Sequence, residues 1–154
     1  MDKNKALIEQ FYSALQNKKI VELQSLYAEN AVFNDPVFSN LNAKRVRAMW
    51  EMLITSGKDM RIEFYNVSGN ATGGTAQWDA YYTFSATGNK VVNRITAHFT
   101  IENGKIVKHT DSFSFYSWAR QALGIPGLLF GWSSLIKAKI RKKAKKNLET
   151  FMSR

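Results

Sequence analysis

Apolar residues recur every three or four positions in the first third of the chain. Leu7, Phe11 and Leu15 illustrate this spacing, which places their side chains on one face of a helix. The pattern predicts three amphipathic helices, at residues 3–17, 20–27 and 43–55. A short strand is predicted at residues 31–34. The strand stops at the Asp35-Pro36 step because proline cannot donate to a ladder and Asp-Pro favours a turn.

The middle of the chain changes to an alternation of apolar and polar residues, which is typical of half-buried strands. Such alternation predicts four strands, at residues 59–68, 75–86, 90–102 and 105–117. Gly88-Asn89 and Asn103-Gly104 have the composition of two-residue hairpin turns. Strands joined in this way form an antiparallel meander. Helices followed by strands predict an α+β fold with the helices on one face of the sheet.

Sorting each strand by parity leaves a few polar side chains on the apolar, helix-covered face. Burial of such groups is costly unless they are hydrogen-bonded. Either each lies at a strand end with a local partner, or together they line a polar-edged pocket; both interpretations stay open. Asp111 stands out because it shares parity with Phe113 and Phe115, and a carboxyl among aromatic rings suits acid–base chemistry. The set comprises Asn66, Tyr82, Asn93, His109 and Asp111.

The chain ends in a basic segment after a break at Gly124–Gly127. Residues 133–151 predict a helix with an apolar stripe, and seven of the ten residues 137–146 are Lys or Arg. Three interpretations compete: a helix docked on the domain with a solvated basic face, a helix on an anionic membrane surface, and non-specific binding of nucleic acid. The apolar connector at 127–132 supports the membrane alternative. Docking is favoured, and nucleic acid is not expected because base-reading and stacking elements are missing.

Composition adds bounds to this picture. A chain of 154 residues with 45% hydrophobic residues is long enough for one domain, expected at 1–154, with 119–154 as a helical extension. The formal net charge is +10, and most of it belongs to the terminal segment. The chain has no cysteine and its N-terminus has no apolar leader, which together predict a cytoplasmic protein.

Several segments resemble the SnoaL-like and ketosteroid-isomerase-like proteins of the NTF2-like superfamily. The resemblance lies in Phe11-Tyr12-Ser13-Ala14-Leu15, in the run from Leu26 to Pro36, in Gly104-Lys105-Ile106-Val107, and in His109-Thr110-Asp111-Ser112-Phe113. It implies a cone-shaped fold in which helices pack on a curved sheet around an apolar pocket. It also implies an apolar small-molecule ligand, no cofactor, no metal, and in many members a homodimer through the outer sheet face.

In the isomerases the aspartate that corresponds to Asp35 is the general base, a mechanism that serves as a standard example of pKa tuning. Without the resemblance, an Asp-Pro turn that caps backbone amides would be preferred. Two family donors are replaced here, by Phe11 and Ala97, which argues against the usual steroid isomerase. The Arg-x-Asp step of the limonene-epoxide-hydrolase-like members is missing after Arg94, which argues against epoxide hydrolysis.

These arguments predict a small-molecule pocket protein. The first hypothesis is an isomerase, cyclase or lyase that transfers protons on an apolar carbonyl compound, with Asp35 as base and Asp111 and His109 as acid or orienting groups. The alternative is a non-catalytic binding module for an apolar ligand or a protein partner. The predicted substrate-binding residues are Phe11, Trp50, Asn66, Trp78, Tyr82, Asn93, Phe99 and Phe113. The predicted dimer face holds Tyr81, Thr83, Arg94, Thr96, His98, Ser114 and Tyr116.

Overall fold

The computed structural model describes residues 2–130 and 133–154. In these ranges the helices are α1 (Asp2–Gln16), α2 (Ile20–Ser25), α3 (Ala43–Ser56), α4 (Phe115–Leu123), α5 (Ile125–Phe130) and α6 (Ser134–Met152). The strands are β1 (Tyr27–Asn34), β2 (Leu41–Asn42), β3 (Arg61–Gly69), β4 (Gly73–Phe84), β5 (Asn89–Glu102) and β6 (Lys105–Ser112).

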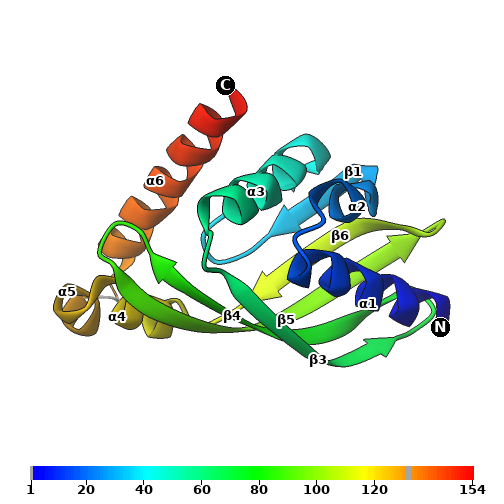
Figure 1. The fold of residues 1–154 in the computed structure, drawn as a ribbon, viewed down its shortest axis with the longest axis horizontal. Helices are drawn as coiled ribbons and strands as arrows, with labels where there is room; N and C mark the ends of the chain where they lie inside the picture. Colours follow the sequence, from blue (N-terminus) through cyan, green and yellow to red (C-terminus); the bar gives the residue numbers. More distant parts are fainter. Residues whose placement is uncertain (1, 131–132) are drawn as a thin grey trace.

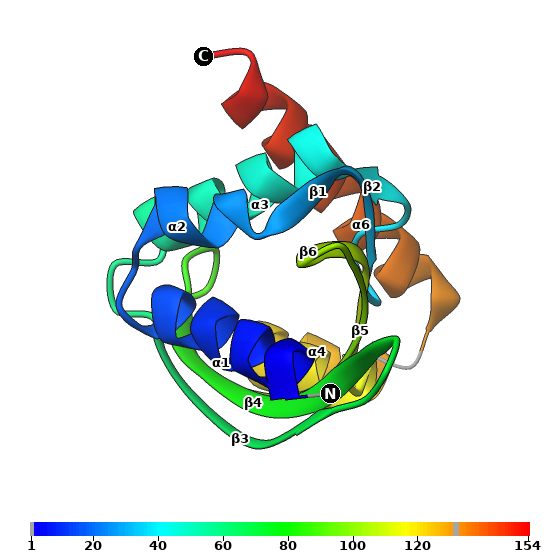
Figure 2. The same ribbon diagram turned by 90° about the vertical axis from the view of Figure 1, so that its right-hand side faces the viewer.

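One curved sheet organises the molecule, with strand order β2-β1-β6-β5-β4-β3. All neighbouring strands are antiparallel except β1 and β6, which are parallel. The helices α1, α2 and α3 cover the concave face, and the end-on view shows sheet and helices enclosing a cone (Figures 1 and 2). The predicted α+β fold, the meander and the side covered by the helices are confirmed.

Sequence alternation explains the sheet well in its central strand. In β5, Val91, Ile95 and Phe99 are buried against the helices, whereas Arg94 and His98 are exposed on the outer face. The turn that follows β5 has positive φ angles at Asn103 and Gly104, as a two-residue hairpin requires. The third helix begins as predicted, because the side chain of Asn42 accepts a hydrogen bond from the Arg45 amide.

Three local predictions are wrong. The strand predicted to reach residue 117 ends at Ser112, because the Ser114 hydroxyl accepts a hydrogen bond from the Ser117 amide and starts α4. The apolar residues after Ser114 therefore follow a helical period. Asn89 already belongs to β5, so the turn before it spans residues 85–88. Tyr27 lies in β1 and not in the second helix.

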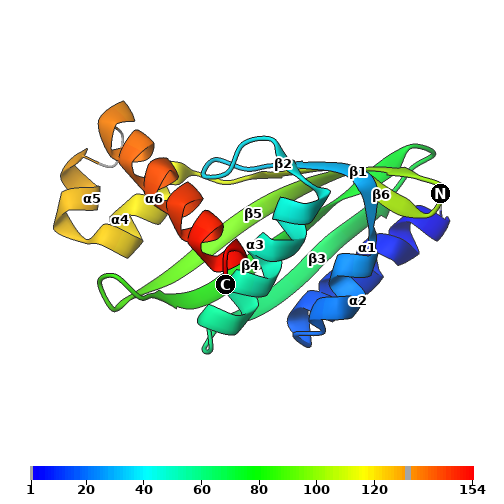
Figure 3. The same cartoon turned by 90° about the horizontal axis from the view of Figure 1, so that it is seen from above.

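The helices α4 and α5 lie at one end of the sheet, and α6 returns along α3 (Figures 1 and 3). Leu148 of α6 is 1% exposed and joins the main core. Docking, the favoured arrangement for the basic helix, thus has support in the part of the chain that the structure describes. Residues 131 and 132 of the apolar connector, and the side chains of 128–130, lie outside the described residues. Among the described helices none is both long and apolar enough to cross a membrane.

Candidate functional site

A cavity of about 560 Å³ opens between the concave face of the sheet, α3 and α6. Its walls are mainly apolar and include the rings of Trp50 from α3 and Trp78 from β4. Their centroids are 6.0 Å apart. Side chains of α6, including Ala144 and Phe151, complete one wall of the cavity. A cavity of this size and polarity matches pockets that hold small organic molecules.

Seven of the predicted site residues line this cavity. They come from the end of β1, from α3, from three strands of the sheet and from the segment that follows β6, and they are Asp35, Trp50, Trp78, Tyr82, Asn93, Asp111 and Phe113. Three others, Phe11, Phe99 and His109, are buried in the core beside the cavity. The inward placement expected for Phe11 and Phe99 is right, but they do not line the cavity.

The inward placement expected for Asn66 is wrong. The pairing of β3 with β4 shifts between Tyr65 and Ser68, and Asn66 itself has a positive φ of 53°. A bulge of this kind changes the face on which the following side chains lie. As a result Asn66 is exposed, and its amide donates a hydrogen bond of 2.6 Å to Gln77 on the outside of the sheet.

Asp35 combines the two roles between which the sequence could not decide. Its Oδ1 accepts hydrogen bonds from the amides of Val37 at 2.7 Å and Phe38 at 2.6 Å, so it does cap the turn. The same carboxyl also lines the cavity. Burial raises the pKa of Asp35 to about 6, against the lowering effect of the two amides and with a further increase from the charge of Asp111.

Asp111 is held by a chain of buried hydrogen bonds. Its Oδ1 lies 2.8 Å from Nε2 of His109, and Nδ1 of His109 lies 2.8 Å from the hydroxyl of Tyr27. The indole Nε1 of Trp50 donates to that hydroxyl at 2.9 Å. Asp111 lines the cavity, whereas His109 and Tyr27 lie behind it in the core.

The donors and acceptors of this chain fix the direction of its protons. Trp50 can only donate, so the Tyr27 oxygen accepts this bond, and the Tyr27 proton finds an acceptor if it is donated to Nδ1 of His109. The remaining ring proton of His109 is then on Nε2 and is donated to Asp111. This is the arrangement in which every member is satisfied, and it presents Asp111 to the cavity as an oriented carboxylate.

Aromatic rings hold His109 in place. Phe99 stacks on the imidazole at 4.2 Å, while Phe33 and Phe11 meet it edge-on at 4.9 and 5.5 Å. Packing on several sides restricts the movement of the ring. The role of Phe11 and Phe99 is therefore to position the histidine, one layer behind the site.

Hydrogen-bond donors lie on the cavity wall formed by β4 and β5. Trp118 Nε1 donates to the Tyr82 hydroxyl at 2.6 Å, which leaves the Tyr82 proton free to point to a ligand. Burial raises the pKa of Tyr82, and the nearby charge of Asp35 adds to this increase, so the hydroxyl stays protonated at neutral pH. Trp78 Nε1 is buried and finds no acceptor among the described residues. Asn93 is 8% exposed and also lines the cavity.

Sequence reasoning missed Tyr27 and Trp118. Tyr27 is the last residue of the helix predicted at 20–27, and Trp118 directly follows the strand predicted at 105–117, so neither is marked as a site residue by its pattern. Both carry a polar atom on an aromatic body, and such groups usually find a partner when they are buried. That tendency marks Tyr27 and Trp118 as candidates but does not name their partners, which lie 82 and 36 residues away in the chain.

Comparison with known proteins now places this architecture. The SnoaL-like domain family model matches residues 8–109. A search of curated protein sequences returns no match. Many solved structures share the fold at low identity.

An NTF2-like protein of unknown function from Burkholderia pseudomallei K96243 is similar over 79% of this chain and 98% of its own, with 16% identity and a TM-score of 0.69. A candidate polyketide cyclase from Pseudomonas putida KT2440 covers 75% and 95%, with 20% identity and a TM-score of 0.64.

A protein described as an LEH-like epoxide hydrolase from M. tuberculosis covers 88% of this chain and 96% of its own, with 16% identity and a TM-score of 0.64. Identities this low support the shared fold alone. The family match spans most of the helices on the concave face and the sheet up to His109, which is the scaffold that carries the cavity. This chain belongs to the SnoaL-like family and has its NTF2-like cone fold.

Proposed function

We propose that the cavity binds an apolar carbonyl compound and transfers a proton on it, as an isomerase or cyclase does. The observation that carries this proposal is the presence of two carboxyl groups, Asp35 and Asp111, on one apolar cavity with different surroundings. Asp111 is oriented by His109, whereas Asp35 has a pKa of about 6. Titratable groups with contrasting environments are typical of acid–base sites.

Asp35 acts as the base in this proposal. At neutral pH it is mostly ionised, yet its pKa is high enough to give a useful driving force for accepting a proton. It takes a proton from the carbon next to the carbonyl group, and the electron pair of that C–H bond moves to form the enolate. Return of the proton to another carbon of the enolate completes an isomerisation. In a cyclisation the enolate carbon forms a bond to a second carbonyl carbon of the same molecule, and the alkoxide that results takes the proton back from Asp35.

The developing enolate oxygen needs hydrogen-bond donors. Phe11 and Ala97 cannot supply them, but Tyr82 and Asn93 carry donors on side chains that line the cavity. Each donor that reaches a developing oxyanion is worth on the order of 10²–10³ in rate. Similar solved structures that bear cyclase or epoxide hydrolase names add the weaker support of a shared fold.

Hydrogen–deuterium exchange on model ketones tests proton transfer without knowledge of the substrate. Apolar cyclic ketones and 1,3-diketones are incubated with the protein in D₂O, and the loss of the signal from the hydrogens next to the carbonyl is followed by proton NMR. Exchange faster than in protein-free buffer is expected. Asp35→Asn should reduce it by ~10²-fold or more, since a positioned general base contributes that much.

Asp79→Asn is a matched control. Asp79 lies in β4 and is 5% exposed, so it is a second buried carboxyl for comparison. It lies on the outer face of the sheet, where it accepts hydrogen bonds from Tyr65 and Arg94. Its substitution should leave exchange unchanged once folding has been verified by circular dichroism. Equal exchange in wild type and Asp35→Asn would refute the proposed base.

The second candidate is a binding module without chemistry. It is favoured by the two family donor positions, which hold the fully buried apolar side chains Phe11 and Ala97. Calorimetry with the same ketones separates the candidates. Binding to the cavity with no exchange above the buffer rate would support the module and exclude proton transfer on that class of compound.

A further inference from the structure

A second cleft lies on the other flank of α6, between α6, α3 and the segment that follows β1. Its volume is about 560 Å³, similar to that of the cavity described above. Val37 and Phe38 form a wall that lines both hollows. The second cleft contains none of the proposed catalytic groups, so it calls for a separate explanation.

Cationic side chains from two helices gather in this cleft. Arg45 comes from α3, and three more cations come from one flank of α6. The acid present is Glu149, whose contact with Arg45 is 3.8 Å long and half exposed, and such pairs contribute little. The cationic cleft, as we name it, is lined by Arg45, Arg141, Lys142, Lys145 and Glu149 together with apolar residues.

The base of the cationic cleft is apolar. Phe38, Leu41 and Leu148 line it and are 8%, 7% and 1% exposed. Charged groups around an apolar base suit a molecule with one anionic end and one apolar end. The chemistry differs from that of a solvated basic face, in which lysines point into water with no cavity between them.

The attachment of α6 gives an anion a structural role. Leu148 is the buried side chain of α6 among its described residues, and Arg141 donates a hydrogen bond to the Ser39 hydroxyl. Like charges on α3 and α6 face a common cleft and repel one another across it. An anion between Arg45 and Arg141 would turn that repulsion into attraction and hold α6 on the body of the protein.

We propose that the cationic cleft binds an amphipathic phosphate. The phosphate lies between Arg45 and Arg141, whose planar guanidinium groups match its oxygens, and the apolar part lies on Phe38. A phosphate dianion offsets most of the local excess of positive charge, which a single carboxylate does less well. The source is either a lipid headgroup or a soluble phosphate ester, which share this chemistry. The inference does not depend on the proposed reaction.

The first experiment titrates the whole protein with n-hexyl phosphate and with inorganic phosphate by calorimetry. The hexyl ester should bind at least ~10-fold more tightly, since burial of its alkyl chain on the apolar base adds a favourable contribution that inorganic phosphate lacks. Amide NMR shifts in the same titration should change at residues 37–41 and 141–149. Equal affinity for the two ligands, or shifts spread over the protein, would overturn the proposal.

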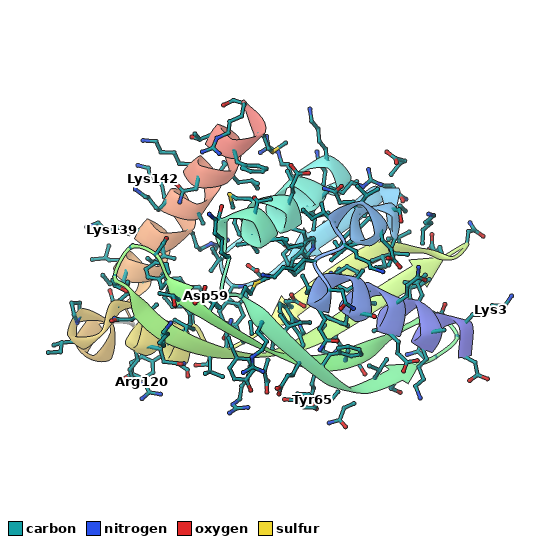
Figure 4. All side chains as sticks on the ribbon, in the orientation of Figure 1. Lys3, Asp59, Tyr65, Arg120, Lys139 and Lys142 are labelled. Atoms are coloured by element: carbon teal, nitrogen blue, oxygen red, sulfur yellow. The ribbon has the colours of Figure 1, made fainter. Side chains whose placement is uncertain are left out.

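Two double variants with the same loss of charge provide the control. Arg141→Ala with Lys145→Ala removes cations from the cleft, whereas Lys139→Ala with Lys146→Ala removes exposed cations on the other side of the same helix. Lys139 points away from the body in Figure 4. The first pair should weaken hexyl phosphate binding by ~10-fold or more and the second by less than ~2-fold. Equal weakening would mean diffuse charge attraction and would sink the idea.

Vesicles distinguish the sources. Phosphatidylcholine vesicles with and without phosphatidic acid, whose phosphate is a monoester like that of hexyl phosphate, are sedimented with the wild type and both double variants. Binding to anionic vesicles that the cleft pair abolishes, together with hexyl phosphate binding, points to a lipid headgroup. Hexyl phosphate binding without vesicle binding points to a soluble ester. If both pairs reduce vesicle binding equally and hexyl phosphate does not bind, the basic helix meets the membrane by general charge attraction. That result would overturn the proposed cleft site.

Discussion

Asp35 shows how one residue can serve the backbone and the cavity together. One carboxylate oxygen accepts the amides of Val37 and Phe38, which fixes the side chain without blocking its other oxygen. Burial among apolar neighbours and the charge of Asp111 act against ionisation, and burial prevails over the two amides. The Asp-Pro turn is therefore the means by which the carboxyl is aimed at the cavity.

The charge of Asp111 should be detectable through Asp35. Asp111→Asn removes a negative charge that raises the pKa of Asp35, while the amide oxygen can still accept from His109. The pKa of Asp35 should therefore fall below about 6 in this variant. Carbon-13 NMR of the labelled carboxyl measures it directly. Asp79→Asn, on the outer face, should leave the titration as it is in wild type; a shift of the same size there would contradict the assigned cause.

The raised pKa of Asp35 also makes the stability of the protein depend on pH. Between pH 3.8, its ordinary pKa, and about 6, the folded protein holds a proton that the unfolded chain releases. The free energy of unfolding should therefore decrease as pH rises through this window and stay lowered above it, by on the order of 2–3 kcal/mol from this group.

Asp35→Asn should remove that loss, because asparagine keeps the oxygen that caps Val37 and Phe38 but carries no charge. Urea denaturation at several pH values should show a more stable variant at pH 7 and equal stability at low pH. Asp59→Asn is the comparison: this exposed carboxyl has its pKa lowered by the Thr83 hydroxyl, so its loss should not stabilise. A less stable Asp35→Asn protein at pH 7 would contradict the argument.

At the scale of elements, α6 is the part whose position matters most to both hollows. Its stripe meets α3 through Leu148, and its flanks line the cavity on one side and the cationic cleft on the other. Leu148→Ala should lower the free energy of unfolding of the whole protein by about 2–5 kcal/mol if α6 and the cone unfold as one unit. We expect instead that α6 opens by itself, so that in hydrogen exchange α6 loses protection first while α1 and the central strands keep theirs.

The matched control for this prediction is Leu135→Ala. Leu135 lies in the same helix but is 77% exposed, so its truncation creates no cavity. Its exchange pattern should equal that of wild type. Uniform loss of protection in Leu148→Ala would show that α6 and the cone unfold as one unit.

The sequence predicts β5 correctly but places the end of β6 too late, and the two strands show why. In β5 every inward residue alternates with an outward one over fourteen residues, so the period identifies the strand and its faces. The few residues after Ser112 fit two patterns equally well, the alternation of a continuing strand and the first turn of a helix. The Ser114 cap decides in favour of the helix, and a single serine is too common to predict it.

For the whole molecule we predict a homodimer through the outer face of the sheet. Ser114 and Tyr116 leave the predicted surface because they belong to the start of α4. The part that remains includes Thr96 and the ion pair of Arg94 with Asp79 at 3.0 Å. Light scattering at high micromolar concentration should give twice the chain mass, and Thr96→Arg should reduce it. Ser134→Arg on α6 serves as the control; a monomeric wild type would refute the dimer.

Periodicity and parity predicted the fold class and the helix-covered face, because both patterns are local and survive without knowledge of contacts. Together with the family resemblance, which singled out Asp35, they also predicted seven of the residues around the cavity. Tertiary structure alone decided the hydrogen-bond chain from Trp50 through Tyr27 and His109 to Asp111. It also decided that Asn66 faces outward. Such features depend on partners distant in the chain and on a bulge that shifts register by one residue. Burial, which makes Asp35 a weaker acid than an exposed aspartate, is likewise a property of the packed cone and not of the Asp-Pro step.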